Sequence, residues 1–175
     1  LAGYFNDLAP MTSATGPDSL DILLIPDFHA WDGRYVNNGW MQECPNPMTK
    51  LTWDNAILIS PKLGKKLQAE NPGLGLIPEP TMLNKQGQIA PDNANFGDGR
   101  QNAPIARIGF GEKSIEGPLY VQPGLADYTV VTTLGMGRRK TGRVGKGTGY
   151  DAASVLDASG NRLVSSAKIG KSEEK

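Results

Sequence analysis

The sequence has 175 residues, of which 38% are hydrophobic, and its 18 basic residues balance 18 acidic ones. This length suits one globular domain with a real core, and the zero net charge gives no global field to recruit nucleic acid or an anionic membrane. No apolar run approaches the about 20 residues that cross a bilayer, so we expect no direct membrane span.

Residues 1–19 are mostly polar and contain Pro10, Gly16 and Pro17, which predicts an N-terminal arm or loop. No charged segment followed by an apolar one is present at this end, so we expect no secretory signal peptide. Because the chain begins at Leu1 rather than at Met, we interpret it as a processed product or as a piece of a longer polypeptide.

The apolar run Leu20–Ile25 predicts a buried strand, because it is too short for a helix and Pro26 stops it. Residues 27–47 are rich in turn-forming residues, which predicts an ordered irregular segment. Long ordered segments of this kind are usually functional or lie against another surface.

A helix is predicted from Ser60 to about Glu70. Ser60 is a good N-cap residue, and Pro61 suits the first helical position. Leu63 and Leu67 then form an apolar pair four residues apart, as on the buried side of a helix.

Residues 73–104 are rich in Pro, Gly and Asn, and they predict a long irregular insertion. The segments that follow predict strands at residues 105–110, 117–122, 128–134 and 161–169, with one helical turn within 151–157. This order predicts a single mainly-β domain with small helices over residues 20–170, followed by a frayed tail at residues 171–175.

Histidine and cysteine occur once each, as His29 and Cys44, so this chain alone cannot build an ordinary zinc site or a four-cysteine iron–sulfur cluster. His29 could act as a general base oriented by Asp27 or Asp32, but a structural or surface histidine is the favoured interpretation. Cys44 is expected to be a buried, inert thiol. Since no nucleophile–base pair is visible, we predict no catalytic residue and no metal ligand.

The segment Gly135–Gly149 is rich in glycine and carries five cations, Arg138, Arg139, Lys140, Arg143 and Lys146. Its backbone N–H groups and cations could hold an anion, although it matches neither the phosphate-binding loop nor the dinucleotide fingerprint. A mobile basic surface loop and a contact with a larger subunit are the alternatives. RNA binding is disfavoured because aromatic stacking partners are sparse in this segment.

Four aromatic residues occur in an otherwise polar stretch, namely Trp31, Tyr35, Trp40 and Trp53. Such a set indicates either a small core beneath a loop or the anchors of an interface, and the sequence leaves both open.

Two stretches, Asn37–Leu67 and Ser114–Ala152, resemble the molybdopterin dinucleotide-binding domain of molybdopterin-family oxidoreductases. In that family a segment ending in Asn and Ala precedes a strand and a short helix, and a later strand ends in Pro-Gly. The matching positions here are Asn55-Ala56, the predicted helix, and Pro123-Gly124. The amino-acid sequence of residues 38–40, 50–55 and 142–145 most resembles that of the large iron–sulfur subunit of alternative complex III, a quinol-oxidising membrane assembly.

This resemblance implies a six-stranded double-psi β-barrel with long irregular insertions. It implies a non-catalytic structural domain of a membrane-bound respiratory electron-transfer complex, on the periplasmic face of the inner membrane. The partners would be the other subunits or the remaining segment of that complex, and iron–sulfur clusters and haem would lie elsewhere in the assembly. The insertion at residues 73–104 and the missing Gly-Asp turn after the helix depart from the family pattern and indicate a divergent member.

Two other functions remain open. In active molybdenum enzymes this domain caps the pterin cofactor, and a molybdopterin here would be contacted by Asn38, Gln42, Arg138 and Arg139. The other alternative is a free-standing anion-binding module that uses Gly135–Gly149.

Overall fold

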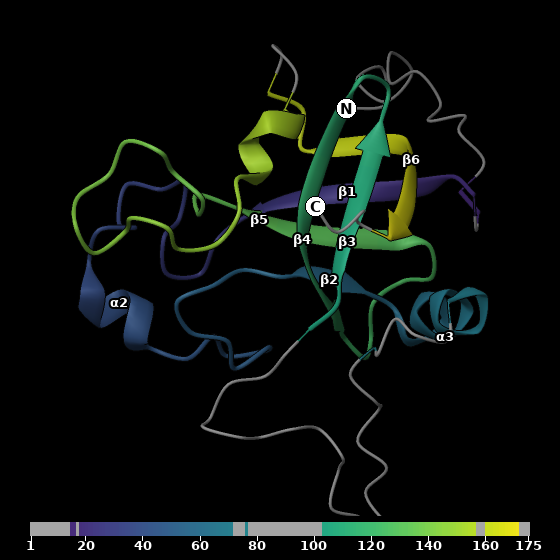
Figure 1. Ribbon diagram of the computed structural model, residues 1–175, viewed down its shortest axis with the longest axis horizontal. Coiled ribbons are helices and arrows are strands. Elements are labelled where there is room, and N and C mark those ends of the chain that lie inside the picture. Colours follow the sequence, from purple (N-terminus) through teal and green to yellow (C-terminus); the bar gives the residue numbers. More distant parts are fainter. Residues whose placement is uncertain (1–14, 17, 72–75, 77–102, 157–159, 172–175) are drawn as a thin grey trace, which may run out of the picture.

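The computed structural model describes residues 15–16, 18–71, 76, 103–156 and 160–171. Within these residues the strands form a closed barrel in the order β1-β5-β2-β4-β3-β6 (Figure 1). Their bounds are β1 (Leu20–Pro26), β2 (Ile57–Ile59), β3 (Ile105–Phe110), β4 (Lys113–Val121), β5 (Thr129–Leu134) and β6 (Leu163–Lys171). The predicted mainly-β barrel with small helices is therefore confirmed.

The barrel mixes parallel and antiparallel pairs. β1 pairs with β5 and β2 pairs with β4 in parallel, whereas the remaining neighbours are antiparallel. Parallel partners cannot be joined by a tight turn, so long connections must leave the barrel and return. The segment between β1 and β2 is such a connection, and it supplies most of the site described below.

The core fills the barrel interior through alternation along the strands. Leu20, Ile22 and Leu24 of β1 are fully buried, whereas Leu23 and Ile25, which alternate with them, are partly exposed. The inward side chains pack against equivalent ones such as Ile57 and Ile108. Each such burial contributes about 1.5–3 kcal/mol relative to exposure. The first strand is thus buried on one face only, rather than throughout as its apolar sequence predicted.

The predicted helix is α3 (Pro61–Glu70), which lies against one end of the barrel (Figure 1). The Ser60 hydroxyl accepts a hydrogen bond from the Leu63 N–H at 3.1 Å, as expected of an N-cap. Leu63 and Leu67 are buried in the core. Two further small elements, α2 (Gly39–Glu43) and the 3-10 turn η3 (Ala152–Val155), begin after the side-chain caps Asn38 and Asp151.

Several predicted boundaries differ from the structure. β4 begins at Lys113 rather than at residue 117, because β3 and β4 form a tight hairpin through Gly111 and Glu112. Gly111 has φ +56°, which suits such a turn. β6 extends to Lys171, so the first residue of the predicted tail belongs to the barrel. Most of the predicted arm at residues 1–19 and of the predicted insertion at residues 73–104, and the tail beyond residue 171, lie outside the described residues.

Candidate functional site

Two connections lie together on one side of the barrel. One is the segment between β1 and β2, which contains α2, and the other follows β5 (Figure 1). The Asn37 carboxamide joins them, because its Oδ1 accepts hydrogen bonds from the Val144 and Gly145 N–H groups, both at 3.1 Å. The two connections therefore form one surface of the domain.

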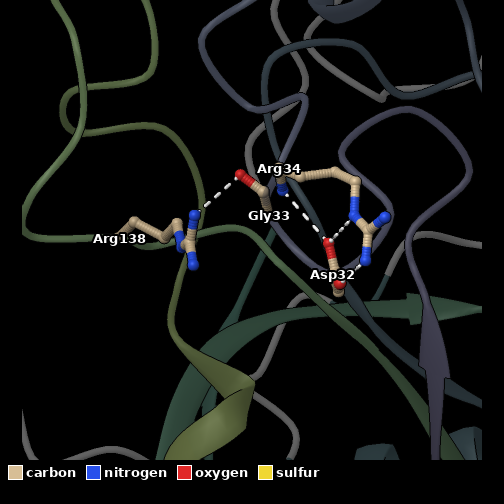
Figure 2. Close-up of polar contacts among 4 residues, drawn as sticks. All are labelled: Asp32, Gly33, Arg34 and Arg138. Atoms are coloured by element: carbon tan, nitrogen blue, oxygen red, sulfur yellow. Dashed lines mark hydrogen bonds and ion pairs between the residues drawn. The ribbon is translucent and has the colours of Figure 1, made fainter.

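The glycine-rich basic segment is anchored by close packing. Figure 2 shows the Arg138 guanidinium directed at the Gly33 carbonyl, and its Nη1 donates there at 2.9 Å. Gly33 has φ +99°, and a Cβ at this position would lie 2.7 Å from Arg138 Nε. Gly135 is equally constrained, since a Cβ there would lie 2.5 Å from the Gly33 nitrogen. The start of the segment therefore packs against the connection between β1 and β2.

His29 is not arranged as a general base. The Asp27 Oδ1 accepts from the backbone N–H groups of His29 and Ala30, at 2.8 and 2.7 Å. Asp32 instead pairs with Arg34 at 2.6 Å (Figure 2). Hydrogen bonding by Arg34 lowers the pKa of this carboxyl from 3.8 to about 2. Both candidate orienting carboxylates are therefore bound elsewhere.

A cavity of about 530 Å³ opens beside this region, between the ends of β1 and β5 and residues 46–56. Its lining includes Phe28, Trp31, Met48 and Trp53, all of which keep exposed apolar surface. The volume falls within the range of about 300–1,000 Å³ that is usual for ligand pockets. We call this space the aromatic cavity.

Two residues that line the aromatic cavity each have a buried polar atom without a hydrogen-bond partner in the described part of the chain. The atoms are His29 Nε2 and Thr133 Oγ1. Leaving such a group unpaired costs about 1–3 kcal/mol. Burial at the same cavity raises the pKa of Asp54, and the hydrogen bond from the Asn55 N–H to its Oδ1 at 2.8 Å only partly offsets this effect. Unsatisfied polar groups therefore gather beside apolar walls.

The backbone is strained at the same place. Trp31 and Trp53 have φ +57° and +61°, a left-handed conformation that bulky side chains disfavour. Each such residue costs on the order of 1–3 kcal/mol and persists only when its surroundings hold it. The Trp31 backbone is held by reciprocal hydrogen bonds with Asp27, both at 3.0 Å, and the Trp53 N–H donates to the Gln42 carbonyl at 3.1 Å.

Asn55 connects the aromatic cavity to the barrel. Its Nδ2 donates to the carbonyls of Thr133 and Tyr150, at 3.3 and 3.2 Å, and its Oδ1 accepts from the Tyr150 N–H at 2.9 Å. The side chain is almost fully buried. A Cβ at Gly149 would lie 2.4 Å from the Asn55 Oδ1, so this close approach requires glycine.

The residues predicted to contact a pterin do not converge. Asn38 is exposed and caps α2 by accepting from the Trp40 N–H. Gln42 is buried and donates to the Val36 carbonyl at 2.9 Å, and it borders the aromatic cavity. Arg138 and Arg139 line a different hollow. The four side chains therefore do not line one cavity of the described structure.

Exposure decides two other expectations. Cys44 is exposed, so the predicted burial of this thiol is wrong; it is the C-cap residue of the short helix α2. Trp31, Tyr35, Trp40 and Trp53 are all substantially exposed, so the alternative prediction that they form a small core is wrong.

Among the described residues no group of three or more His, Cys, Asp or Glu could hold a metal ion. No helix in the described ranges is long and apolar enough to cross a membrane.

No protein-family model matches the chain, and a search of curated proteins finds no match either.

Proposed function

We propose that this chain is a non-catalytic, partner-binding β-barrel of a membrane-bound quinol-oxidising complex of the alternative complex III type. The observation that carries the proposal is a set of six exposed apolar side chains on the connection between β1 and β2, four of which also line the aromatic cavity. We call it the aromatic face; it consists of Phe28, Trp31, Tyr35, Trp40, Met48 and Trp53. Two of the three stretches that resemble that subunit, residues 38–40 and 50–55, lie on the same connection.

The exposure of the aromatic face is unusual for a surface that meets only water. Trp40 is 85% exposed, Met48 69% and Phe28 62%. Aromatic side chains bury about 150–250 Å² each at an interface, at about 25 cal/mol per Å², so a few of them can supply most of a binding energy. Clusters of exposed apolar side chains usually mark interaction sites. The partner in this proposal is another subunit or segment of the same complex.

The proposal assigns no cofactor to this chain. Iron–sulfur clusters and haem belong to other parts of the assembly, on the periplasmic face of the inner membrane. The one cysteine of the sequence agrees with this division, since four thiolates are needed for an ordinary cluster. In the proposed role the barrel holds neighbouring subunits in place.

Elemental analysis tests the proposal. The tagged chain is isolated with its native assembly from gently solubilised membranes of the source organism, and iron and molybdenum are measured per chain. We expect iron without molybdenum. Molybdenum near one atom per chain would instead make this domain the cap of an active molybdopterin site, and a chain that purifies alone with neither metal would contradict both functions.

A second candidate function, a free-standing anion-binding module, rests on the cations of Gly135–Gly149. Arg139, Lys140, Arg143 and Lys146 are exposed, and none has an ion-pair partner within the described residues. Affinity for a polyanion such as heparin should then fall steeply between 50 and 200 mM salt, on the order of the salt dependence of phosphate contacts. A weak or salt-insensitive interaction would remove this candidate.

A further inference from the structure

The aromatic cavity is lined by acidic side chains and by no lysine or arginine of the described residues. The acidic residues are Asp27 and Asp54. The Asp27 Oδ1 already accepts two backbone N–H groups, whereas the Asp54 carboxylate accepts one. Asp54 therefore keeps acceptor capacity at the cavity wall, and an anionic ligand would be repelled there.

The unpaired polar atoms of the cavity match hydrogen-bond donors. His29 Nε2 can accept in one neutral tautomer, and the Thr133 hydroxyl has two acceptor lone pairs. Together with the Asp54 carboxylate they offer acceptors on three segments that lie far apart in the sequence. A wholly apolar ligand would leave these atoms unpaired and would keep their desolvation cost.

The aromatic walls favour positive charge in the same space. Trp31, Trp53 and Phe28 line the cavity, and the faces of Trp and Phe attract cations through the ring quadrupole. The left-handed backbone of both tryptophans indicates that the fold holds these rings at the cavity despite local strain.

We propose that the aromatic cavity binds the ammonium or guanidinium group of an organic cation, with Asp54, His29 and Thr133 as acceptors and Trp31 and Trp53 as walls. The donor hydrogens of the group satisfy the acceptors, and its charge is balanced by Asp54. A quaternary ammonium fits less well because it has no N–H to donate. The aromatic cavity and the aromatic face share Phe28, Trp31, Met48 and Trp53, but binding of the cation is tested on the free chain and does not depend on the proposed role in a respiratory complex.

The test is a titration of the full chain followed by tryptophan fluorescence. The probes are 2-phenylethylammonium, its N,N,N-trimethyl analogue and the anionic isostere 3-phenylpropanoate. We expect saturable binding of 2-phenylethylammonium, about tenfold weaker binding of the trimethyl analogue, and no saturable binding of the anion. Binding of 3-phenylpropanoate as tightly as the ammonium would overturn the proposal.

Two variants identify the acceptors. Asp54→Asn keeps an oxygen for the Asn55 N–H, and Thr133→Val removes a hydroxyl that has no partner in the described part of the structure. Each is expected to weaken binding of 2-phenylethylammonium about tenfold, since a charge-assisted hydrogen bond contributes about that factor. Thr133→Val should weaken binding without lowering the Tm, because the hydroxyl that it removes has no partner in the described part of the structure.

The matched controls are Asp127→Asn, which removes a surface partner of Lys62, and Thr129→Val in the same strand as Thr133. Neither residue lines the cavity, and neither substitution should change the affinity. Unchanged affinity in both Asp54→Asn and Thr133→Val would refute the proposal.

The same titration separates two sources of the cation. A short peptide with one arginine is compared with 2-phenylethylammonium. Tighter binding of the peptide assigns the group to a protein side chain, and tighter binding of the amine assigns it to a free small molecule; the failure of both to bind contradicts the proposal.

Discussion

Replacing Asn55 by alanine should destabilise the domain strongly, because this buried side chain joins the start of β2 to the end of β5 and to Tyr150. Three hydrogen bonds are lost, at 2.9, 3.2 and 3.3 Å. A typical intramolecular hydrogen bond contributes about 1 kcal/mol, and unpaired buried partners cost more. We therefore expect Asn55→Ala to lower the free energy of unfolding by about 3 kcal/mol.

Urea unfolding followed by tryptophan fluorescence measures this loss, with the m-value checked for a change in the exposed surface. Asn38→Ala is the comparison, since Asn38 is exposed and its side chain accepts one hydrogen bond, from the Trp40 N–H at 3.1 Å. Loss of such a cap should cost about 1 kcal/mol. If Asn55→Ala costs no more than Asn38→Ala, Asn55 is not the connection that we describe.

Three further outcomes follow from the packing and the charges. Ile22→Ala should lower the free energy of unfolding by about 2–5 kcal/mol in the same urea assay, because Ile22 is fully buried in the barrel; a loss below about 1 kcal/mol would mean that the site collapses or that the core is placed wrongly. Gly33→Ala should lower the Tm because its φ is +99° and its Cβ would meet the Arg138 side chain, and an unchanged Tm would contradict the close packing of the two connections. The Asp32 carboxyl should titrate near pH 2 by NMR and return toward 3.8 in Arg34→Met; a midpoint near 3.8 in the unmodified chain would show that the pair does not persist in solution. Since the folded pKa lies below the ordinary value, this pair favours the folded state above pH 3.8 and loses its contribution as the pH falls toward 2.

The sequence predicted those elements whose start is set by neighbouring residues along the chain. Ser60 and Pro61 fixed the start of α3, and their side-chain geometry follows that expectation. The hairpin through Gly111 and Glu112 was missed, although a glycine between two strand-like runs is a usable turn signal. The helix α2 was also missed, because five residues carry no apolar periodicity.

The aromatic cavity could not be predicted, because residues distant in the sequence create it. His29 and Thr133 are more than a hundred positions apart, and only the parallel pairing of β1 with β5 brings their segments to the same end of the barrel. The sequence did draw attention to the aromatic residues at 31–53, but it could not show that they are exposed. The four residues that the sequence offered as pterin contacts under the alternative function do not line one cavity.

Site-specific photo-crosslinking tests the central claim most directly. A photoreactive amino acid replaces Trp40, the most exposed aromatic residue of the aromatic face, in the chain expressed in its native membrane, and replaces Glu112 in the β3–β4 turn as the control. We predict that position 40 cross-links to one other component of an iron-containing membrane complex and that position 112 does not. Equal cross-linking from both positions, or none from position 40, would contradict a partner-binding role for the aromatic face.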